Sequence, residues 1–218
     1  AGLRWVEMSD IIDAQISPLG EIAMDRARIQ PGERVIDIGC GCGQTTIGLA
    51  ARVGESGSVL GLDISDPMLA SAQERARDAG LSNVEFESGD AQVHPLEEGA
   101  FDLLFSRFGV MFFESPVDAF ANMLRALRPG GRLTFLAWQE LGKNPWMQVP
   151  VMAAMKKLPP AGPPPEPNAP GPFAFADRDR VAEILRKSGF DDVSHEPLER
   201  DLLVGGGRSL EETAEFLT

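Results

Sequence analysis

The chain of 218 residues is 43% hydrophobic, which is enough to build the core of one globular domain. Its formal net charge of −13 and its four lysines disfavour a nucleic acid as partner, because proteins that bind polyanions present a basic surface. No apolar run approaches the roughly 18 residues of a membrane span, and no signal peptide is recognisable. Cys40 and Cys42 are too close in sequence to staple the fold, so we expect a cytoplasmic protein.

Taken in chain order, residues 1–30 predict a cap of two short helices, split near Pro18. Apolar strands then alternate with amphipathic helices through residues 31–140. The predicted strands are 34–39, 58–63, 83–88, 101–107 and 132–138. The predicted caps of the helices between them are Thr45 or Thr46, Ser65 and Ser115. This alternation predicts a parallel sheet covered by helices on both faces, with a ligand outside the carboxyl ends of the strands.

The last third of the chain is less regular. Residues 141–176 are expected to form a Pro-rich insertion on the substrate side, and its segment 159–172 carries eight prolines. That segment is either a stiff surface connection or the edge of a lid. Residues 177–218 predict a helix over 177–190, a strand over 192–198 and the start of a further helix, which complete the same domain. Because the sequence does not begin with Met and that last helix is cut short, we expect native sequence to be missing at both ends.

The glycine-rich loop in "VIDIGCGCGQTT" (35–46) follows the first predicted strand. A closed zinc site needs four ligands and this loop offers two thiolates, so we expect no metal. A phosphate-binding Walker loop needs a lysine where this loop has Gln44. A dinucleotide is a closer competitor, since Asp63 lies 20 residues after Gly43 and suits a ribose. An NAD(P)-dependent oxidoreductase therefore stays open as an alternative, although Gln44 stands where that fingerprint has Gly or Ala.

The stretch "DIGCGCG" (37–43) resembles motif I of the class I S-adenosylmethionine-dependent methyltransferases. Four further segments resemble the same family, in the same order: "GLDISDPML" (61–69), "GDAQVHPL" (89–96), "FDLLFSRFGVMFF" (101–113) and "LRPGGRLTFLAW" (127–138). The resemblance covers residues 33–138, about half the chain, and is greatest to the type 11 branch of ubiquinone/menaquinone C-methyltransferases.

This resemblance implies an α/β fold: a Rossmann-like, doubly wound, mostly parallel sheet with helices on both faces. The family ends its sheet with an antiparallel hairpin, of which only 192–198 clearly supplies a strand, so the final strands are expected to be truncated.

The resemblance implies S-adenosylmethionine as the cofactor. Gly39, Gly41 and Gly43 would let the backbone approach its methionine part, and Asp37 suits its cationic end. Asp63 would accept both ribose hydroxyls. The remaining positions implied for the cofactor are Ile64 and Met68 against the adenine, Asp90, Ala91 and Gln92 at its edge, Ser106 at the methionine part, and Trp5 with Arg4 as a cover. Met68 could instead belong to the core, Asp90 to a turn, and Trp5 with Arg4 to the surface.

A wall for substrate is expected after the fourth and fifth strands. Its members are Arg107, Phe108, Met111, Phe112, Trp138 and Trp146, each of which could equally be core. Such a wall suits a small apolar or aromatic molecule. Methyl transfer mainly requires positioning, and a base is needed only for a nucleophile that loses a proton. His94 and His195 are the candidate bases, and a structural role is the alternative for each.

Three functions remain after the sequence is read. The first is methyl transfer from S-adenosylmethionine to a small molecule. The second is the oxidoreductase, whose short-chain form is excluded because the chain has no tyrosine for a Tyr-Lys pair. The third is a regulator that binds the cofactor without catalysis. The "SRFG" stretch (106–109) replaces the Pro-Pro-aromatic motif of DNA-methylating relatives, which disfavours a base as substrate. The oligomeric state cannot be read from the sequence.

Overall fold

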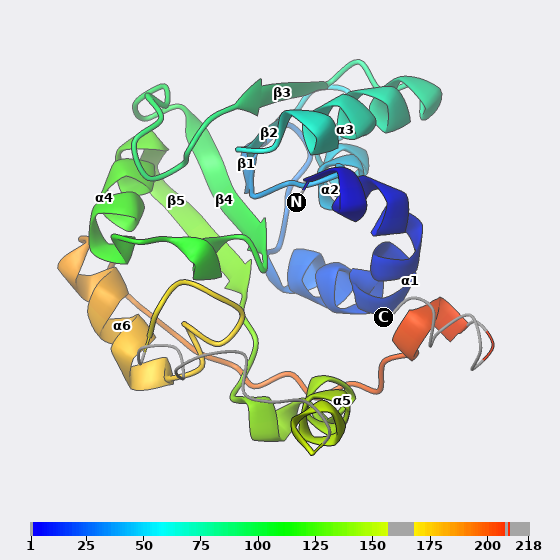
Figure 1. The fold of residues 1–218 in the computed structure, drawn as a ribbon. Coiled ribbons are helices and arrows are strands. Elements are labelled where there is room, and N and C mark those ends of the chain that lie inside the picture. The colour runs from blue at the N-terminus through cyan, green and yellow to red at the C-terminus, as the bar shows by residue number, and fades with distance from the viewer. Residues whose placement is uncertain (1, 157–167, 208, 210–218) are drawn as a thin grey trace.

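Five apolar segments form one parallel sheet in the order β3-β2-β1-β4-β5 in the computed structural model, which describes residues 2–156, 168–207 and 209 (Figure 1). The strands are β1 (Arg34–Ile38), β2 (Ser58–Asp63), β3 (Val84–Ser88), β4 (Phe101–Arg107) and β5 (Leu127–Leu136). This confirms the predicted α/β class. The order reverses between β1 and β4, and in sheets of this kind ligands bind in a crevice outside the carboxyl ends of the strands at such a reversal.

The helices cover both faces of the sheet (Figure 1). They are α1 (Gly2–Arg26), α2 (Gln44–Val53), α3 (Asp66–Asp78), α4 (Pro116–Ala126), α5 (Pro145–Met155) and α6 (Arg178–Lys187). On one face α1 and α2 pack on alternate strand residues such as Val35 and Leu103. On the other face α4 and α6 pack on the neighbouring positions Ile36 and Leu104. Successive residues of the central strands β1 and β4 point to opposite faces and are mostly apolar, because both faces of the sheet are buried there.

The amino-terminal cap differs from the prediction of two short helices. It is one helix, α1, with Pro18 inside it. A proline removes one backbone hydrogen bond, yet both sides of Pro18 are held by packing. Gln15, Leu19 and Met24 are buried on the inner side of α1, so the tertiary contacts outweigh the local cost of the proline.

The cap of α2 also differs from the prediction. Gly43, in the left-handed conformation, precedes α2, and neither Thr45 nor Thr46 caps it. Their hydroxyls are directed to Asp37 instead. Ser65 and Ser115 do precede α3 and α4 as predicted, although their side chains make no capping hydrogen bond.

The carboxyl-terminal part of the prediction is partly wrong. The predicted helix is present as α6, but residues 192–198 and 200–203 form no strand. The chain instead returns to α1, where Glu196 pairs with Arg26 at 2.9 Å and Gly205 N–H donates to Gln15. A short 3-10 helix, η3 (Val204–Gly207), packs there. Among the described residues the sheet therefore has only its five parallel strands. The helix expected to begin after 208 lies outside the described residues.

The insertion at 141–176 contains structure that the sequence did not predict. A 3-10 turn, η2 (Leu141–Lys143), leads into α5, which lies apart from the sheet (Figure 1). Much of the Pro-rich stretch, residues 157–167, lies outside the described residues. No helix in the described ranges is long and apolar enough to cross a membrane.

At the switch point the loops after β1 and β4 approach closely through the backbone of two glycines. A Cβ on Gly39 would lie 2.8 Å from the Cα of Gly109, and a Cβ on Gly109 would lie 2.6 Å from the carbonyl oxygen of Ile38. The fully buried Ser106 ties the same loops together, because its hydroxyl donates to the Ile38 carbonyl at 2.8 Å and accepts from Gly109 N–H at 3.2 Å. Two glycines and one serine thus set the spacing of the crevice.

This contact predicts that Gly109→Ala destabilises the fold by about 1–3 kcal/mol, since the neighbouring atoms are backbone and cannot move aside cheaply. Urea unfolding measures the change. Gly142→Ala is the control, because a Cβ there would meet nothing closer than 4.0 Å. Equal stability of the two variants would contradict the steric account.

Candidate functional site

The glycine loop after β1 is held open by left-handed backbone. Gly39, Gly41 and Gly43 have φ of 67°, 57° and 81°, which glycine adopts without the strain of a side chain. Gly39 N–H donates to the Leu62 carbonyl at 2.8 Å, so the loop is fixed to β2. At Gly43 a Cβ would lie 2.8 Å from Cβ of Ala72 on α3. The loop can therefore pass close to a ligand while α2 and α3 pack beside it.

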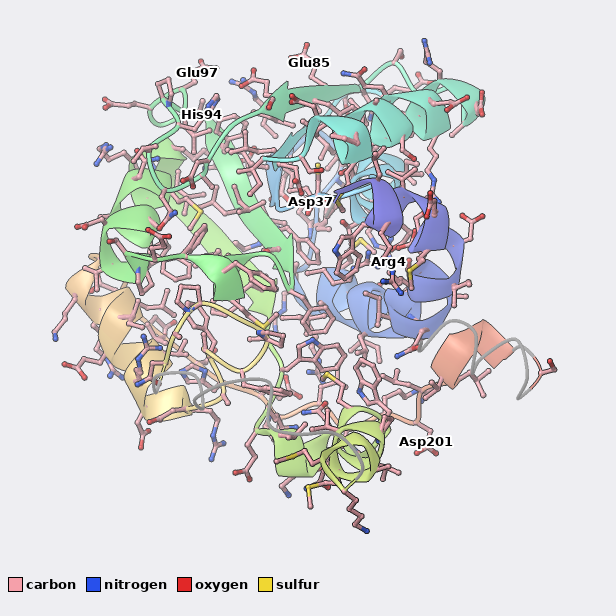
Figure 2. All side chains as sticks on the ribbon, in the orientation of Figure 1. Arg4, Asp37, Glu85, His94, Glu97 and Asp201 are labelled. Carbon is pink, nitrogen blue, oxygen red and sulfur yellow. The ribbon has the colours of Figure 1, made fainter. Side chains whose placement is uncertain are left out.

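Asp37 is a buried charge at the base of this loop, in the centre of the sheet in Figure 2. Its Oδ2 accepts hydrogen bonds from the Thr45 and Thr46 hydroxyls at 2.6 and 2.7 Å. Its Oδ1 is buried and has no hydrogen-bond partner within the described part of the chain. Burial raises the pKa of Asp37 from 3.8 to about 6, against the two threonine hydrogen bonds and Arg107, which lower it. A cation beside Oδ1 would favour the ionised form.

Asp63 ends β2 and faces the same loop. Its Oδ2 accepts from Gly41 N–H and its Oδ1 from Ser65 N–H, both at 2.9 Å. Each carboxylate oxygen can accept more than one hydrogen bond, so both keep capacity for a ligand. Ile64, next in sequence, is 75% exposed, and a Cβ on Gly41 would lie 3.0 Å from Cε of Met68.

The turn after β3 presents Asp90. The Asp90 carboxylate accepts from the backbone and side-chain N–H groups of Gln92, and Gln92 Oε1 accepts from Ser115 N–H at 3.0 Å. Ala91 is buried, and Asn122 on α4 donates to its carbonyl. The turn is thus anchored to α4 and leaves the Asp90 side chain at the surface.

The start of α1 lies over this side of the crevice. A Cβ on Gly2 would lie 2.3 Å from the Ser65 hydroxyl, directly after β2. Trp5, on the same turn of α1, is 50% exposed, and Arg4 is exposed too. Arg4 belongs to α1, and Figure 2 shows it outside the sheet.

Arg107, which was predicted as part of the substrate wall, makes its side-chain hydrogen bonds to two helices. Its guanidinium donates to Gln44 Oε1 on α2 and to Asp13 on α1, at 3.1 Å for Asp13. Asp13 also pairs with Arg75 of α3 at 2.8 Å. Arg107 therefore links α1 and α2 beside the glycine loop, and Asp13 extends the link to α3.

The aromatic wall itself is assembled by the loops after β4 and β5. The Phe108 and Trp138 rings stack with centroids 4.1 Å apart and an angle of 5° between their planes. Trp146 lies 5.4 Å from Trp138. Met111 is buried and its sulfur accepts from the backbone N–H of Trp138, whereas Phe112 is 54% exposed. The rings of Phe108, Trp138 and Trp146 come together as predicted, and Phe112 is turned toward solvent.

The two candidate bases have other neighbours in the fold. His94 Nε2 is 2.9 Å from Glu87, and Figure 2 shows His94 well away from Asp37. His195 lies beside α6, where burial and the charges of Arg178 and Arg186 lower its pKa. Cys40 and Cys42 are buried thiols whose pKa values burial raises. In the described ranges no group of three or more His, Cys, Asp or Glu side chains could hold a metal.

A separate hollow of about 390 Å³ opens at the other end of the sheet, among the starts of β1, β2 and β4. Its lining includes Arg34, Glu85 and Glu97. Figure 2 shows Glu85 and Glu97 far from Asp37, so this hollow is distinct from the crevice at the carboxyl ends of the strands.

Some residues of the site were not predicted for their roles. Thr45 and Thr46 are predicted as helix caps, but they lie in the first turn of α2 and their hydroxyls bond the buried Asp37. Gly109 lies within the stretch 101–113, but nothing in the sequence indicates its contact with Gly39. The salt bridge of Asp13 with Arg107 joins residues 94 positions apart and carries no sequence signal.

Comparison with known proteins agrees with this geometry. The family model "Methyltransferase domain" matches residues 29–162. A ubiquinone/menaquinone biosynthesis C-methyltransferase of Ectopseudomonas mendocina is 36% identical over 140 residues, which are 63% of this chain and 54% of the relative. A demethylmenaquinone methyltransferase of Oceanobacillus iheyensis is 36% identical over 110 residues, 50% of this chain and 46% of the relative. The chain spans about half the length of these curated relatives.

Solved structures share the fold. A SAM-dependent methyltransferase from Aquifex aeolicus is 25% identical with a TM-score of 0.59, over 78% of each chain. A putative S-adenosylmethionine-dependent methyltransferase from Methanococcus maripaludis is 28% identical with a TM-score of 0.56, over 72% of this chain and 70% of the other. The [4+2]-cyclase SpnF is 26% identical with a TM-score of 0.59, over 79% of this chain and 56% of the other.

The parallel sheet, its reversal at β1 and β4 and the glycine loop define a class I S-adenosylmethionine-dependent methyltransferase fold. Since the family model covers more than half of the chain, the protein belongs to the methyltransferase domain family. The comparisons give no support to the oxidoreductase or to the non-catalytic regulator.

The buried carboxyl of Asp37 predicts a pH-dependent cost to folding. Its pKa in the folded protein, about 6, lies above the ordinary value of 3.8, so the folded state holds an extra proton between those pH values. The free energy of unfolding should therefore fall as pH rises from about 4 to 6, by on the order of 3 kcal/mol, and this slope should be missing in Asp37→Asn.

Urea unfolding of both proteins across this range measures the difference between them. The exposed Asp118→Asn is the control and should keep the slope of the wild type. If Asp37→Asn also kept it, Asp37 would not titrate in this window.

Proposed function

We propose that the whole protein transfers a methyl group from S-adenosylmethionine to a small apolar or aromatic molecule. The observation that carries the proposal is the pair of carboxylates around the glycine loop. Asp37 offers a buried oxygen without a partner among the described residues, and Asp63 offers two oxygens on the neighbouring strand. An ammonium and a ribose diol are the complements of these two groups.

The cofactor's two polar ends would be held by these side chains. Asp37 would face the ammonium of the methionine part, which the backbone of Gly39 and Gly41 can approach because no Cβ intervenes. Asp63 would accept the ribose hydroxyls while its bonds to Gly41 and Ser65 keep the loop in place. Ser106 would act on the methionine part indirectly, since its hydroxyl already has two backbone partners.

The adenine would lie between exposed apolar surface and the turn after β3. Ile64 and Met68 would contact its faces. Asp90 would accept from its amino group, and the Ala91 N–H would donate to a ring nitrogen, with Gln92 holding the Asp90 carboxylate. Trp5 at the start of α1 would cover the site and limit the access of water.

When bound, S-adenosylmethionine supplies an electrophilic methyl group on a sulfonium centre. The residues of this chain then have to hold a nucleophile in line with that methyl and keep water away. The wall of Phe108, Met111, Trp138 and Trp146 would orient the substrate by its flat or apolar surface. Arg107 would hold α1 and α2 beside the glycine loop instead of contacting substrate.

A quinone-type substrate fits the names of the relatives, which act in ubiquinone and menaquinone biosynthesis or on demethylmenaquinone. A ring system of that kind would match the aromatic wall. No base is assigned, because His94 contacts Glu87 and His195 lies beside the arginines of α6. That the partner is not a nucleic acid, and that the protein is cytoplasmic, remain predictions from charge and cysteine content.

Fold alone does not establish methyl transfer, as the likeness to a [4+2]-cyclase illustrates. The direct test is incubation of the protein with S-adenosylmethionine labelled in its methyl group and a panel of quinols, phenols and polyketides. The proposal expects label to enter at least one aromatic compound. Cofactor binding without label transfer to any of them would favour the regulator.

The bonds of Asp63 predict that Asp63→Ala weakens binding of S-adenosylhomocysteine by on the order of a hundredfold, since charge-assisted hydrogen bonds to the ribose are lost and the Gly41 N–H loses its acceptor. Isothermal calorimetry measures the affinity. Asp66→Ala, an exposed carboxylate at the start of α3, is the matched control and should bind as the wild type does. Unchanged affinity in Asp63→Ala would remove the ribose assignment.

A further inference from the structure

Trp146 carries a polar group that the rest of the fold does not use. Its indole Nε1 is buried, yet no hydrogen-bond partner for it exists among the residues that the structure describes. Tryptophan N–H groups that are buried usually find an acceptor, because an unpaired donor away from water is costly. Trp146 is the second residue of α5, which lies in the insertion that follows β5.

The ring of Trp146 belongs to the aromatic wall. It lies 5.4 Å from Trp138 at an angle of 58°, and Trp138 stacks on Phe108 at 4.1 Å. Phe108 directly precedes Gly109, whose backbone touches Gly39 of the glycine loop. The unpaired donor thus stands at the outer end of a continuous row of rings that begins beside the cofactor loop.

The row is also held under backbone strain. Phe108 has a φ of 64°, in the left-handed region that a phenylalanine rarely occupies. Such strain persists where surrounding structure fixes it, and it gathers at binding and active sites. Here Phe108 N–H is bonded to the Leu136 carbonyl, and the ring is held flat against Trp138.

We propose that Trp146 Nε1 is the specificity contact of the substrate site and donates a hydrogen bond to an oxygen on a planar aromatic substrate, such as an aryl ketone, a quinone or a phenolate. This inference rests on the proposed function, because it uses the same wall. The indole N–H can only donate, so its complement is an acceptor. Because the N–H has no partner among the described residues of the free protein, a substrate oxygen that reaches it replaces no existing hydrogen bond.

Two matched probes isolate this hydrogen bond. The compound 2-acetonaphthone has a carbonyl where 2-isopropenylnaphthalene has a carbon-carbon double bond, and the two are otherwise alike in shape. Equilibrium dialysis with saturating S-adenosylhomocysteine measures the binding of each probe to the wild type and to Trp146→Phe. The control Met155→Gln changes a residue of α5 that is 70% exposed.

We expect the wild type and Met155→Gln to prefer the ketone by about five- to tenfold, the worth of one hydrogen bond. We expect Trp146→Phe to bind both probes about equally, through loss of affinity for the ketone alone. Thermal unfolding without ligand checks that both variants are folded at the temperature of the dialysis, since Trp146→Phe removes part of a packed ring as well as the donor. A wild type that shows no preference, or a variant that keeps it, would overturn the proposal.

The outcome also separates this inference from the proposed function. Calorimetry with S-adenosylhomocysteine alone reports on the cofactor site. If that compound binds but the ketone preference is absent, the Trp146 contact is wrong and the methyltransferase proposal stands. If the cofactor does not bind, the dialysis is repeated without it, and the preference for the ketone still decides the role of Trp146.

Discussion

The backbone contact between Gly39 and Gly109 is the constraint on which the rest of the site depends. It fixes how closely the loops after β1 and β4 run at the point where the strand order reverses. Ser106 holds the same spacing with two hydrogen bonds. On one side of this contact lie the carboxylates of Asp37 and Asp63, and on the other lie the aromatic rings that follow β4.

The two sides differ in chemistry in a way that suits a charged cofactor and an apolar substrate. The side of Asp37 and Asp63 presents buried or half-buried acid groups and glycine backbone, which are complements of cations and hydroxyls. The other side presents stacked rings and, in Trp146, a buried indole donor without a partner among the described residues. Methyl transfer needs such a junction, because the polar donor and the flat acceptor must meet at one defined angle.

The elements that depend on local sequence pattern could be predicted. The strands of the sheet and the helices α3, α4 and α6 follow from apolar runs and their flanking residues, and the motifs located the glycine loop and Asp63. Sequence-based prediction failed where contacts between residues far apart in the chain decide the local structure. Pro18 remains inside α1 because both sides of it pack, and residues 192–198 form no strand but run toward α1, where Glu196 pairs with Arg26. The direction of the Arg107 side chain could not be predicted either, since Asp13 and Gln44 lie far from it in sequence.

The central claim is that the crevice between the loops after β1 and β4 is shaped for S-adenosylmethionine and not for a dinucleotide. Calorimetric titration of the wild-type protein with S-adenosylmethionine, S-adenosylhomocysteine and NAD tests it most directly. The account predicts saturable binding of both sulfur compounds at one site per chain, and no heat from NAD. Binding of NAD in preference to the sulfur compounds would contradict it.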